Sequence, residues 1–363
     1  MSLKFNDINS NYKINKKNID KNIKKVINHG QFIMGPEIDL LEKKLSNFAN
    51  TKYCITTSSG TDSLLISLMQ FGIKEGDEVI TTPFSWISTA EVITLLKAKP
   101  VFVDIQEDSC NLDPSLLKKA ITNKTKAIIP VSLFGQTADL KEIRKLAKEN
   151  GNIPVIEDAA QSFGAKYKNK RFCSFTDVAC TSFFPSKPLG CYGDGGAIFT
   201  NSKKIADKCK ALRLHGQVSK NNFKYIGING RMDTLQAAVL LGKFNNYQKE
   251  LNLRIKAGKY YDYLFDKNNI RRLKTKRDRE NIFAQYVIFH SKRRMILNSL
   301  MKERIPTAIY YPKLITEHQA YLSTKDFPVS KKISKEIFSV PFSPYISKKT
   351  QEKIVKIILR TIF

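Results

Sequence analysis

Several features that would mark other protein classes are missing from this sequence. No run of about 18 apolar residues occurs, so we expect no membrane-spanning segment. The N-terminal residues lack an apolar signal core, and the six cysteines include no Cys-x-x-Cys pair; both features favour a cytoplasmic protein with reduced thiols. The four histidines show no metal-ligand spacing with one another or with the cysteines, so we expect no metal site.

Acidic residues are scarce beside basic ones. The chain has 61 Lys and Arg but only 33 Asp and Glu, which gives a net charge of +28. Such a balance is typical of nucleic-acid-binding proteins, and this class is the alternative to an enzyme. However, the lysines are spread through segments rich in Asn and Ile, and no zinc finger, RNP sequence or basic zipper accompanies them. We therefore expect no nucleic-acid partner, and a positive field that attracts anionic substrates.

What is present is a long alternation of strand and helix patterns. A chain of 363 residues with 42% hydrophobic content can bury a large core, and we expect two domains. Short β-branched runs followed by helical patterns indicate an α/β fold with a mostly parallel sheet covered on both faces. The candidate strands are residues 53–57, 78–82, 100–104, 127–131, 154–157, 178–183 and 197–200.

A long helical pattern over residues 232–265 is followed by a change in composition. We place the domain boundary near its middle. Residues 1–251 are predicted to form a large cofactor-binding domain with an N-terminal arm, and residues 252–363 a smaller C-terminal α/β domain. The strongly basic segment 267–280 is predicted to be a solvated loop.

Two residues supply groups that pyridoxal phosphate chemistry requires. Asp158 stands at the end of one predicted strand, and Lys187 follows another. An amine forms a Schiff base with the cofactor aldehyde, and a carboxylate at the end of a buried strand keeps the pyridine nitrogen protonated, so that the ring accepts electrons. A lysine in a loop and an acid after a strand are common on their own. Ser182, Gln161 and the glycine-rich stretch at 193–196 strengthen the interpretation.

A possible anion site lies between another predicted strand and helix. Residues 58–63 read SSGTDS, in which Gly60 allows close backbone approach. The hydroxyls and the free amides at the start of a helix make an anion cradle, although an ordinary N-cap explains the same residues. Trp86 is the only tryptophan in the chain, and a lone tryptophan is usually part of a core.

Three long, ordered motifs carry a resemblance to a known family. They are EDAAQSFGA at residues 157–165, ACTSFFPSK at 179–187 and GDGGA at 193–197. From about Gly30 to its C-terminus the chain resembles the DegT-type nucleotide-sugar aminotransferases, which are fold-type I pyridoxal phosphate enzymes. The resemblance implies a seven-stranded sheet in the large domain, pyridoxal 5'-phosphate as the cofactor, and Lys187 and Asp158 as catalytic residues.

The resemblance also implies which other residues bind the cofactor. Gly60, Thr61 and Ser182 would bind its phosphate, Trp86 would stack on the pyridine ring, and Gln161 would reach the ring hydroxyl or the ring face.

The segment NGRMD, which begins at Asn229, resembles the part of the family that crosses to a neighbouring subunit. Asn229 would then contact the partner's cofactor phosphate, and Arg231 would line the partner's sugar pocket. This implies a homodimer with shared active sites; a turn that caps the following helix is the alternative. Tyr310 and Tyr311 would bind the substrate.

Two positions depart from the family pattern. Tyr310 and Thr316 both stand where family members commonly carry histidine, and these positions usually lie beside the sugar. The departures therefore concern the substrate rather than the reaction. His215 matches a family position near the mouth of the site, but a structural role explains it equally well.

Within the family, residues 180–196, 214–217 and 229–238 look most like one branch. That branch aminates C3 of UDP-2-acetamido-2-deoxy-3-keto-glucuronic acid for O-antigen or capsule synthesis, with glutamate as the donor. Amination at C4 of a UDP- or dTDP-4-keto-6-deoxy sugar is the alternative. A sugar 3-dehydratase shares the fold but has histidine in place of the Schiff-base lysine, so Lys187 argues against that class.

Overall fold

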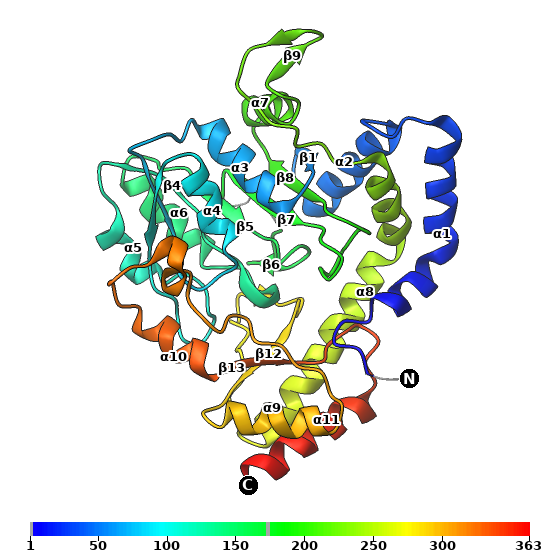
Figure 1. The fold of residues 1–363 in the computed structure, drawn as a ribbon, viewed down its shortest axis with the longest axis vertical. Helices are drawn as coiled ribbons and strands as arrows, with labels where there is room; N and C mark the ends of the chain where they lie inside the picture. Colours follow the sequence, from blue (N-terminus) through cyan, green and yellow to red (C-terminus); the bar gives the residue numbers. More distant parts are fainter. Residues whose placement is uncertain (1–2, 172–174) are drawn as a thin grey trace.

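The structure is a computed structural model that describes residues 3–171 and 175–363 (Figure 1). Cys173 lies outside the described residues. A larger unit occupies the upper part of Figure 1, and a smaller unit that contains the C-terminus lies below it.

Seven strands of the described residues form one sheet in the larger unit. A three-stranded part and a four-stranded part are joined by parallel bridges from Ile128 to Val155 and from Val131 to Asp158. The strands pair in parallel, except that β8 runs antiparallel to β7 and β1. This confirms the predicted, mostly parallel sheet. In spatial order the strands are β3 (Lys99–Phe102), β2 (Glu78–Thr81), β4 (Thr125–Ile128), β5 (Ile156–Asp158), β7 (Val178–Ser182), β8 (Gly196–Thr200) and β1 (Tyr53–Thr57).

Helices cover both faces of this sheet, because neighbouring strand residues point to opposite sides. On one face Ala197 and Phe199 pack with α2 (Pro36–Ala49) and α8 (Thr234–Lys267). On the other face Ile198 packs with α3, α4 and α7. The remaining helices of this unit are α3 (Gly60–Phe71), α4 (Ser88–Leu95), α5 (Pro114–Ala120), α6 (Leu140–Glu149), α7 (Lys203–Arg213) and the short η1 (Leu133–Gly135).

One long helix, α8, connects the units. The N-terminal helix α1 (Ile8–His29) packs along α8, which runs without a break into the smaller unit (Figure 1). Leu251 packs in the core beneath the sheet, whereas Tyr261 and Phe265 pack in the core of the smaller unit. We propose that the domain boundary falls at this change, between residues 251 and 252. Along the described ranges, no helix is both long and apolar enough to cross a membrane.

The smaller unit is an antiparallel pair of strands with helices packed on it. β12 (Tyr286–Phe289) pairs with β13 (Ile337–Val340), and α9 (Arg293–Lys302) contacts α11 (Lys348–Ile362). α10 (Pro328–Glu336) and the short η2 (Ile315–Glu317) and η3 (Gln319–Tyr321) lie between β12 and β13 in the sequence. Two further short pairs are β6 (Lys166–Tyr167) with β11 (Arg279–Glu280), and β9 (Gln217–Ser219) with β10 (Asn222–Phe223), a hairpin that projects at the top of Figure 1.

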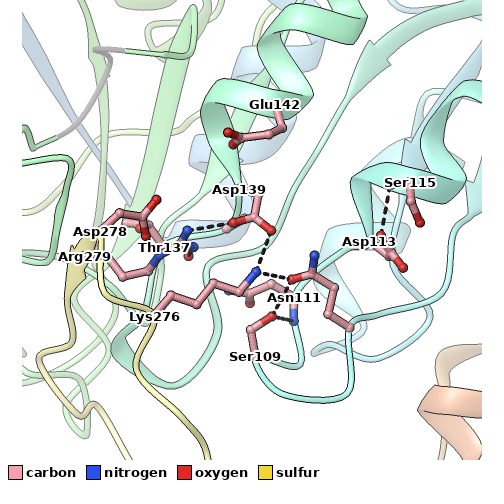
Figure 2. Close-up of polar contacts among 12 residues, drawn as sticks. Ser109, Asn111, Asp113, Ser115, Thr137, Asp139, Glu142, Lys276, Asp278 and Arg279 are labelled. Carbon is pink, nitrogen blue, oxygen red and sulfur yellow. Dashed lines mark hydrogen bonds and ion pairs between the residues drawn. The ribbon is translucent and has the colours of Figure 1, made fainter.

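The prediction of a solvated loop at 267–280 is wrong for the end of this segment, because Lys276 and Arg279 anchor it to the larger unit. Lys276 Nζ donates to Asp139 Oδ2 at 2.8 Å, and Arg279 Nη2 donates to Asp139 Oδ1 at 2.7 Å (Figure 2). Arg279 is buried and also donates to the Thr137 carbonyl at 2.6 Å. Burial alone would raise the pKa of Asp139, but these two cations lower it below its usual value.

Candidate active site

Asp158 lies at the carboxyl end of β5, where its side chain is almost fully buried. Its Oδ2 accepts a hydrogen bond from Thr89 Oγ1 at 2.8 Å, and its Oδ1 accepts one from the Ala160 amide at 3.2 Å. Burial raises the pKa of Asp158, while these two donors and the positive charge of Lys187 oppose the rise. The carboxylate is therefore held in a low-dielectric site, with donors that stabilise its charged form.

Lys187 lies in the loop that follows β7, and its amide donates to the Phe184 carbonyl at 2.8 Å. Burial lowers the pKa of the Lys187 amine, and the negative charge of Asp158 opposes this shift. A lowered pKa increases the fraction of neutral amine, which is the nucleophilic form. The structure thus brings together the two residues that the sequence analysis selected as catalytic.

The predicted anion cradle lies at the N-terminus of α3, against the end of β7. A Cβ atom at Gly60 would lie 2.7 Å from the Ser182 Cβ, so only glycine permits this approach. Ser59 caps the helix, since its side chain accepts from the Asp62 amide at 3.0 Å. Within the described chain, the amides of Gly60 and Thr61 have no recorded acceptor. Free amides at the positive end of a helix bind anions, so this position can hold a phosphate.

The predicted aromatic and amide contacts converge on Tyr311. Gln161 Nε2 donates to the Tyr311 hydroxyl at 3.1 Å, and Gln161 Oε1 accepts from the Phe134 amide at 2.9 Å. The Trp86 ring lies 6.5 Å from the Tyr311 ring, and Trp86 is 63% exposed rather than part of the core. Burial raises the pKa of the Tyr311 hydroxyl. Gln161 keeps one amide hydrogen for a ligand, because its other hydrogen and its oxygen are engaged by the protein.

The structure also places three further residues from the sequence analysis. Tyr310 lies next to Tyr311, with ring centroids 6.1 Å apart. Tyr310 packs beside Phe5, with ring centroids 6.4 Å apart, and burial raises its pKa. Thr316 is buried in η2. His215 is exposed in a left-handed turn with φ 59°, and its amide donates to the Ile228 carbonyl at 3.0 Å.

The segment at Asn229 borders the anion cradle of its own chain through its backbone. The Ser58 amide donates to the Gly230 carbonyl at 2.9 Å. The side chain of Asn229 is exposed, and Arg231 is partly buried. Among the residues that the structure describes, the buried Nε of Arg231 has no hydrogen-bond partner.

The sequence analysis did not identify two polar side chains beside the catalytic pair. Thr89 lies 69 residues before Asp158 in the sequence, and its hydroxyl donates to Asp158. The Ser85 Oγ lies 3.3 Å from the same hydroxyl. Glu157 is fully buried and accepts from Ser132 Oγ at 2.6 Å. Thr89 lies three residues after Trp86, which the sequence analysis singled out, and this proximity was the available signal.

The site combines a buried acid, a lysine of lowered pKa and a phosphate cradle at the carboxyl edge of an α/β sheet. This combination defines the class of enzyme, a pyridoxal phosphate-dependent aminotransferase. The family model described as the DegT/DnrJ/EryC1/StrS aminotransferase family matches residues 13–359, and the chain belongs to this family. Both findings confirm the family and the cofactor that the motifs predicted.

Three similar proteins illustrate the relationship. A relative from Pseudomonas aeruginosa, described as UDP-2-acetamido-2-deoxy-3-oxo-D-glucuronate aminotransferase, is 46% identical over 345 residues, which cover 95% of this chain and 96% of the relative. The crystal structure of a DegT DnrJ EryC1 StrS aminotransferase from Brucella abortus has a TM-score of 0.95 at 36% identity and covers 99% of both chains. A Bacillus subtilis structure, described as NtdA with bound cofactor PMP, has a TM-score of 0.89 at 28% identity and covers 96% of this chain and 82% of that chain.

The residues present fit the cofactor. The cradle at Gly60 and Thr61 offers amides with no recorded acceptor in the described chain, and the Ser182 hydroxyl lies at the same place. Asp158 is a buried carboxylate of the kind that pairs with a protonated ring nitrogen. Among the described residues, no cluster of three or more His, Cys, Asp or Glu side chains could hold a metal ion.

Proposed function

We propose that the chain transfers an amino group from glutamate to the 3-keto group of UDP-2-acetamido-2-deoxy-3-keto-glucuronic acid, in the synthesis of O-antigen or capsule sugars. The observation that carries this proposal is the 46% identity, over nearly the whole of both chains, with the Pseudomonas aeruginosa aminotransferase of that substrate. The positive charge of the chain supports an anionic substrate.

In this proposal Lys187 and Asp158 carry the chemistry. The bound cofactor supplies an electron sink for the carbon that bears the transferred nitrogen. Lys187 would hold the cofactor through its Nζ, and the freed amine would act as the base and acid that moves a proton at the carbon bearing the transferred nitrogen. The lowered pKa of Lys187 supports this role, because the neutral amine accepts a proton. Asp158 remains charged and holds the ring nitrogen protonated, and its two hydrogen-bond donors support that charge.

The other predicted ligands of the cofactor orient it. Gly60, Thr61 and Ser182 bind the phosphate at the start of α3, which fixes one end of the molecule. Trp86 covers the ring, and its exposed face supports this assignment because it leaves room for a stacked partner. Gln161 contacts the ring edge through its remaining amide hydrogen.

We further propose that the enzyme is a homodimer in which Asn229 and Arg231 serve the site of the partner. Asn229 is exposed and Arg231 is only partly buried, so both side chains keep surface that a second subunit can contact. The projecting hairpin β9–β10 and the segment after it carry exposed apolar residues, Phe223 at 60% and Ile226 at 90% (Figure 1). Apolar groups of this kind are typical of a surface that a second subunit covers.

Arg231 is the proposed partner of the substrate carboxylate. A uronic acid brings a carboxylate beyond its two phosphates, and an unpaired buried charge is costly. A guanidinium can bind a carboxylate with two hydrogen bonds, and the Arg231 side chain is only partly buried in the single chain. Tyr311 can donate its own hydroxyl proton, because Gln161 donates to its oxygen, and Tyr310 lies next to it.

The cytoplasm is the proposed location. The described cysteines carry buried thiols, as expected of a protein in a reducing compartment, and they are Cys54, Cys110, Cys180, Cys191 and Cys209.

The test is the reverse reaction with 2-oxoglutarate as the acceptor. Purified chain is offered a UDP-3-amino uronic acid or a UDP- or dTDP-4-amino-6-deoxy sugar, and formation of glutamate is measured. The proposal expects the 3-amino uronate to lose its nitrogen much faster than either 4-amino sugar. If only a 4-amino sugar reacts, the C3 assignment is wrong and the C4 alternative replaces it.

The variant Arg231→Lys tests whether Arg231 binds the carboxylate of the substrate. It should weaken turnover of the uronate by about 1.5–3 kcal/mol, the range for a hydrogen bond to a charged group, and affect a neutral amino sugar much less. An equal loss with both substrates would remove Arg231 from recognition of the carboxylate.

A further inference from the structure

The loop that carries Lys187 is tightly closed at its base. The Cys191 amide donates to the Phe183 carbonyl at 2.8 Å, which joins the two ends of the loop. A Cβ atom at Gly190 would lie 2.5 Å from the Pro185 carbonyl oxygen, so the two sides of the loop touch there. A restraint on Gly190 therefore acts on the whole loop, including Lys187 between these residues.

Two side chains of α8 form hydrogen bonds with this loop. Gln236 Oε1 accepts from the Tyr192 amide at 2.8 Å, and its Nε2 donates to the Tyr192 carbonyl at 3.3 Å. Lys243 Nζ donates to the Gly190 carbonyl at 2.5 Å and lies 4.3 Å from the centre of the Tyr192 ring. Gln236 and Lys243 are two helical turns apart, so they share one face of α8.

Lys243 is an unusual choice for a purely structural contact. Its side chain is only 4% exposed, and burial lowers its pKa to about 8, against the opposing charges of Cys191 and Glu250. Lys243 and Lys187 also line one cavity between the N-terminal residues, α8 and the segment after β13.

We propose that Lys243 is a positioning residue for the transamination: it holds the Gly190 carbonyl and the Tyr192 ring, and thereby fixes the loop that presents the Lys187 amine beside Asp158. This inference rests on the proposed role of Lys187. It adds to that role a residue that acts through the Gly190 carbonyl and the Tyr192 ring.

The charge of Lys243 makes the restraint dependent on pH. Below its pKa the ammonium bonds the carbonyl and attracts the Tyr192 ring; above it, the attraction to the ring is lost. The restraint is therefore strongest below this pKa and weakens as the pH rises through about 8. The titratable and charged groups that face Lys243 or line its cavity are Cys191 and Tyr192 of the loop, Lys187, Glu250 and Arg254 of α8, Asp7 of the N-terminal segment, and Tyr345.

Lys243→Met tests the proposal, with Lys249→Met as the matched control on an exposed position of the same helix. Hydrogen–deuterium exchange of the full chain without cofactor reports the loop directly. In Lys243→Met the amides of Lys187 and Cys191 should exchange about tenfold faster, the factor that one lost hydrogen bond produces. The amide of Ile198 in β8 should not change, and Lys249→Met should match the wild type at every site.

Steady-state kinetics with the cofactor supply the second readout. The kcat of Lys243→Met should fall by about tenfold to a hundredfold, the scale for a misplaced catalytic group, while KM stays close to that of the wild type. The fall in kcat of the wild type above about pH 8 should be smaller in this variant. Unchanged loop exchange and unchanged kcat would overturn the proposal, as would a uniform rise in exchange across the chain, which indicates general destabilisation.

A separate experiment tests whether Lys187 is the lysine that holds the cofactor. Borohydride reduction of the wild-type chain with cofactor marks the lysine that holds it, whatever the behaviour of Lys243. A mark on another lysine overturns the role of Lys187. A mark on Lys187 with no effect of Lys243→Met overturns only the positioning role.

Discussion

The hydroxyl of Thr89 donates a 2.8 Å hydrogen bond to Oδ2 of Asp158, and both residues are buried. The bond joins the first turns of α4 to the end of β5, so a side chain outside every recognised motif sets the environment of the acid. Burial raises the pKa of Asp158, and this hydrogen bond is the first of the interactions that lower it again.

Thr89→Val should therefore shift the pH dependence of the reaction. Without the bond, the pKa of Asp158 rises further, and the charged carboxylate is lost at a higher pH than in the wild type. The acid limb of the pH profile of kcat should move to higher pH by about one pH unit, because a hydrogen bond to a charged group contributes a free energy of about that size. Thr94→Val, on the same helix but bonded to the Ala90 carbonyl, is the control. An unmoved acid limb would exclude Thr89 from this role.

Asp158→Asn tests the charge itself. The amide keeps the shape of the side chain but cannot balance a protonated ring nitrogen, so transamination should fall by about 10²–10³-fold, the scale for loss of a preorganised electrostatic partner. The phosphate cradle is untouched, so cofactor should still bind, which equilibrium dialysis can measure. Turnover close to that of the wild type would remove Asp158 from the mechanism.

Long motifs and strand patterns allowed much of this structure to be predicted. Each candidate strand of the larger unit corresponds to a strand of the sheet, because buried parallel strands are continuous apolar runs. The predicted helix over 232–265 corresponds to α8. Lys187 and Asp158 were recognisable because β-strand ends bring sequence-distant residues to one edge of a sheet.

The remaining features depend on partners that a local pattern does not reveal. The end of the basic segment before Glu280 was misread because two of its cations, Lys276 and Arg279, pair with Asp139, more than a hundred residues earlier. The helix α1 has a sparse apolar pattern, and it buries only Asn15, Ile19 and Val26 against its neighbours. The contact of Gln161 with the Phe134 amide involves main chain, which no side-chain motif encodes.

The shared site can be tested by mixing two inactive variants. If Arg231 serves the partner, a Lys187→Ala chain combined with an Arg231→Ala chain forms a heterodimer in which one site carries neither lesion. Part of the activity should return after subunit exchange, measured with the same reverse assay. A mixture of Lys187→Ala and Asp158→Asn chains is the control. Each of these lesions damages the site of its own chain, so both sites of the heterodimer are damaged and the mixture should stay inactive. No recovery in the first mixture, with exchange demonstrated, places Arg231 in the site of its own chain.

Glu157 should make the stability of the protein depend on pH. Burial raises the pKa of Glu157 from 4.5 to about 7, with the charge of Asp158 acting in the same direction. Between these values the folded chain holds a proton that the unfolded chain has released, so this contribution to stability falls as the pH rises. Glu157→Gln cannot ionise and should escape this loss.

The measurement is urea unfolding of both proteins at about pH 5 and pH 8, on either side of the shifted pKa. The free energy of unfolding of Glu157→Gln minus that of the wild type should be larger at the higher pH. Glu149→Gln, an exposed position at the end of α6, should show no such change. A difference that is independent of pH would contradict a protonated Glu157 in the folded chain.

The most direct test of the account is to locate the lysine that holds the cofactor. Wild-type chain is incubated with pyridoxal phosphate, reduced with borohydride, digested and examined by peptide mass spectrometry. The account predicts a single modified lysine, Lys187, a visible absorption band that disappears on reduction, and no adduct in Lys187→Ala, which still binds cofactor through its phosphate. An adduct on a different lysine, or none in the wild-type chain, would contradict the active site described above.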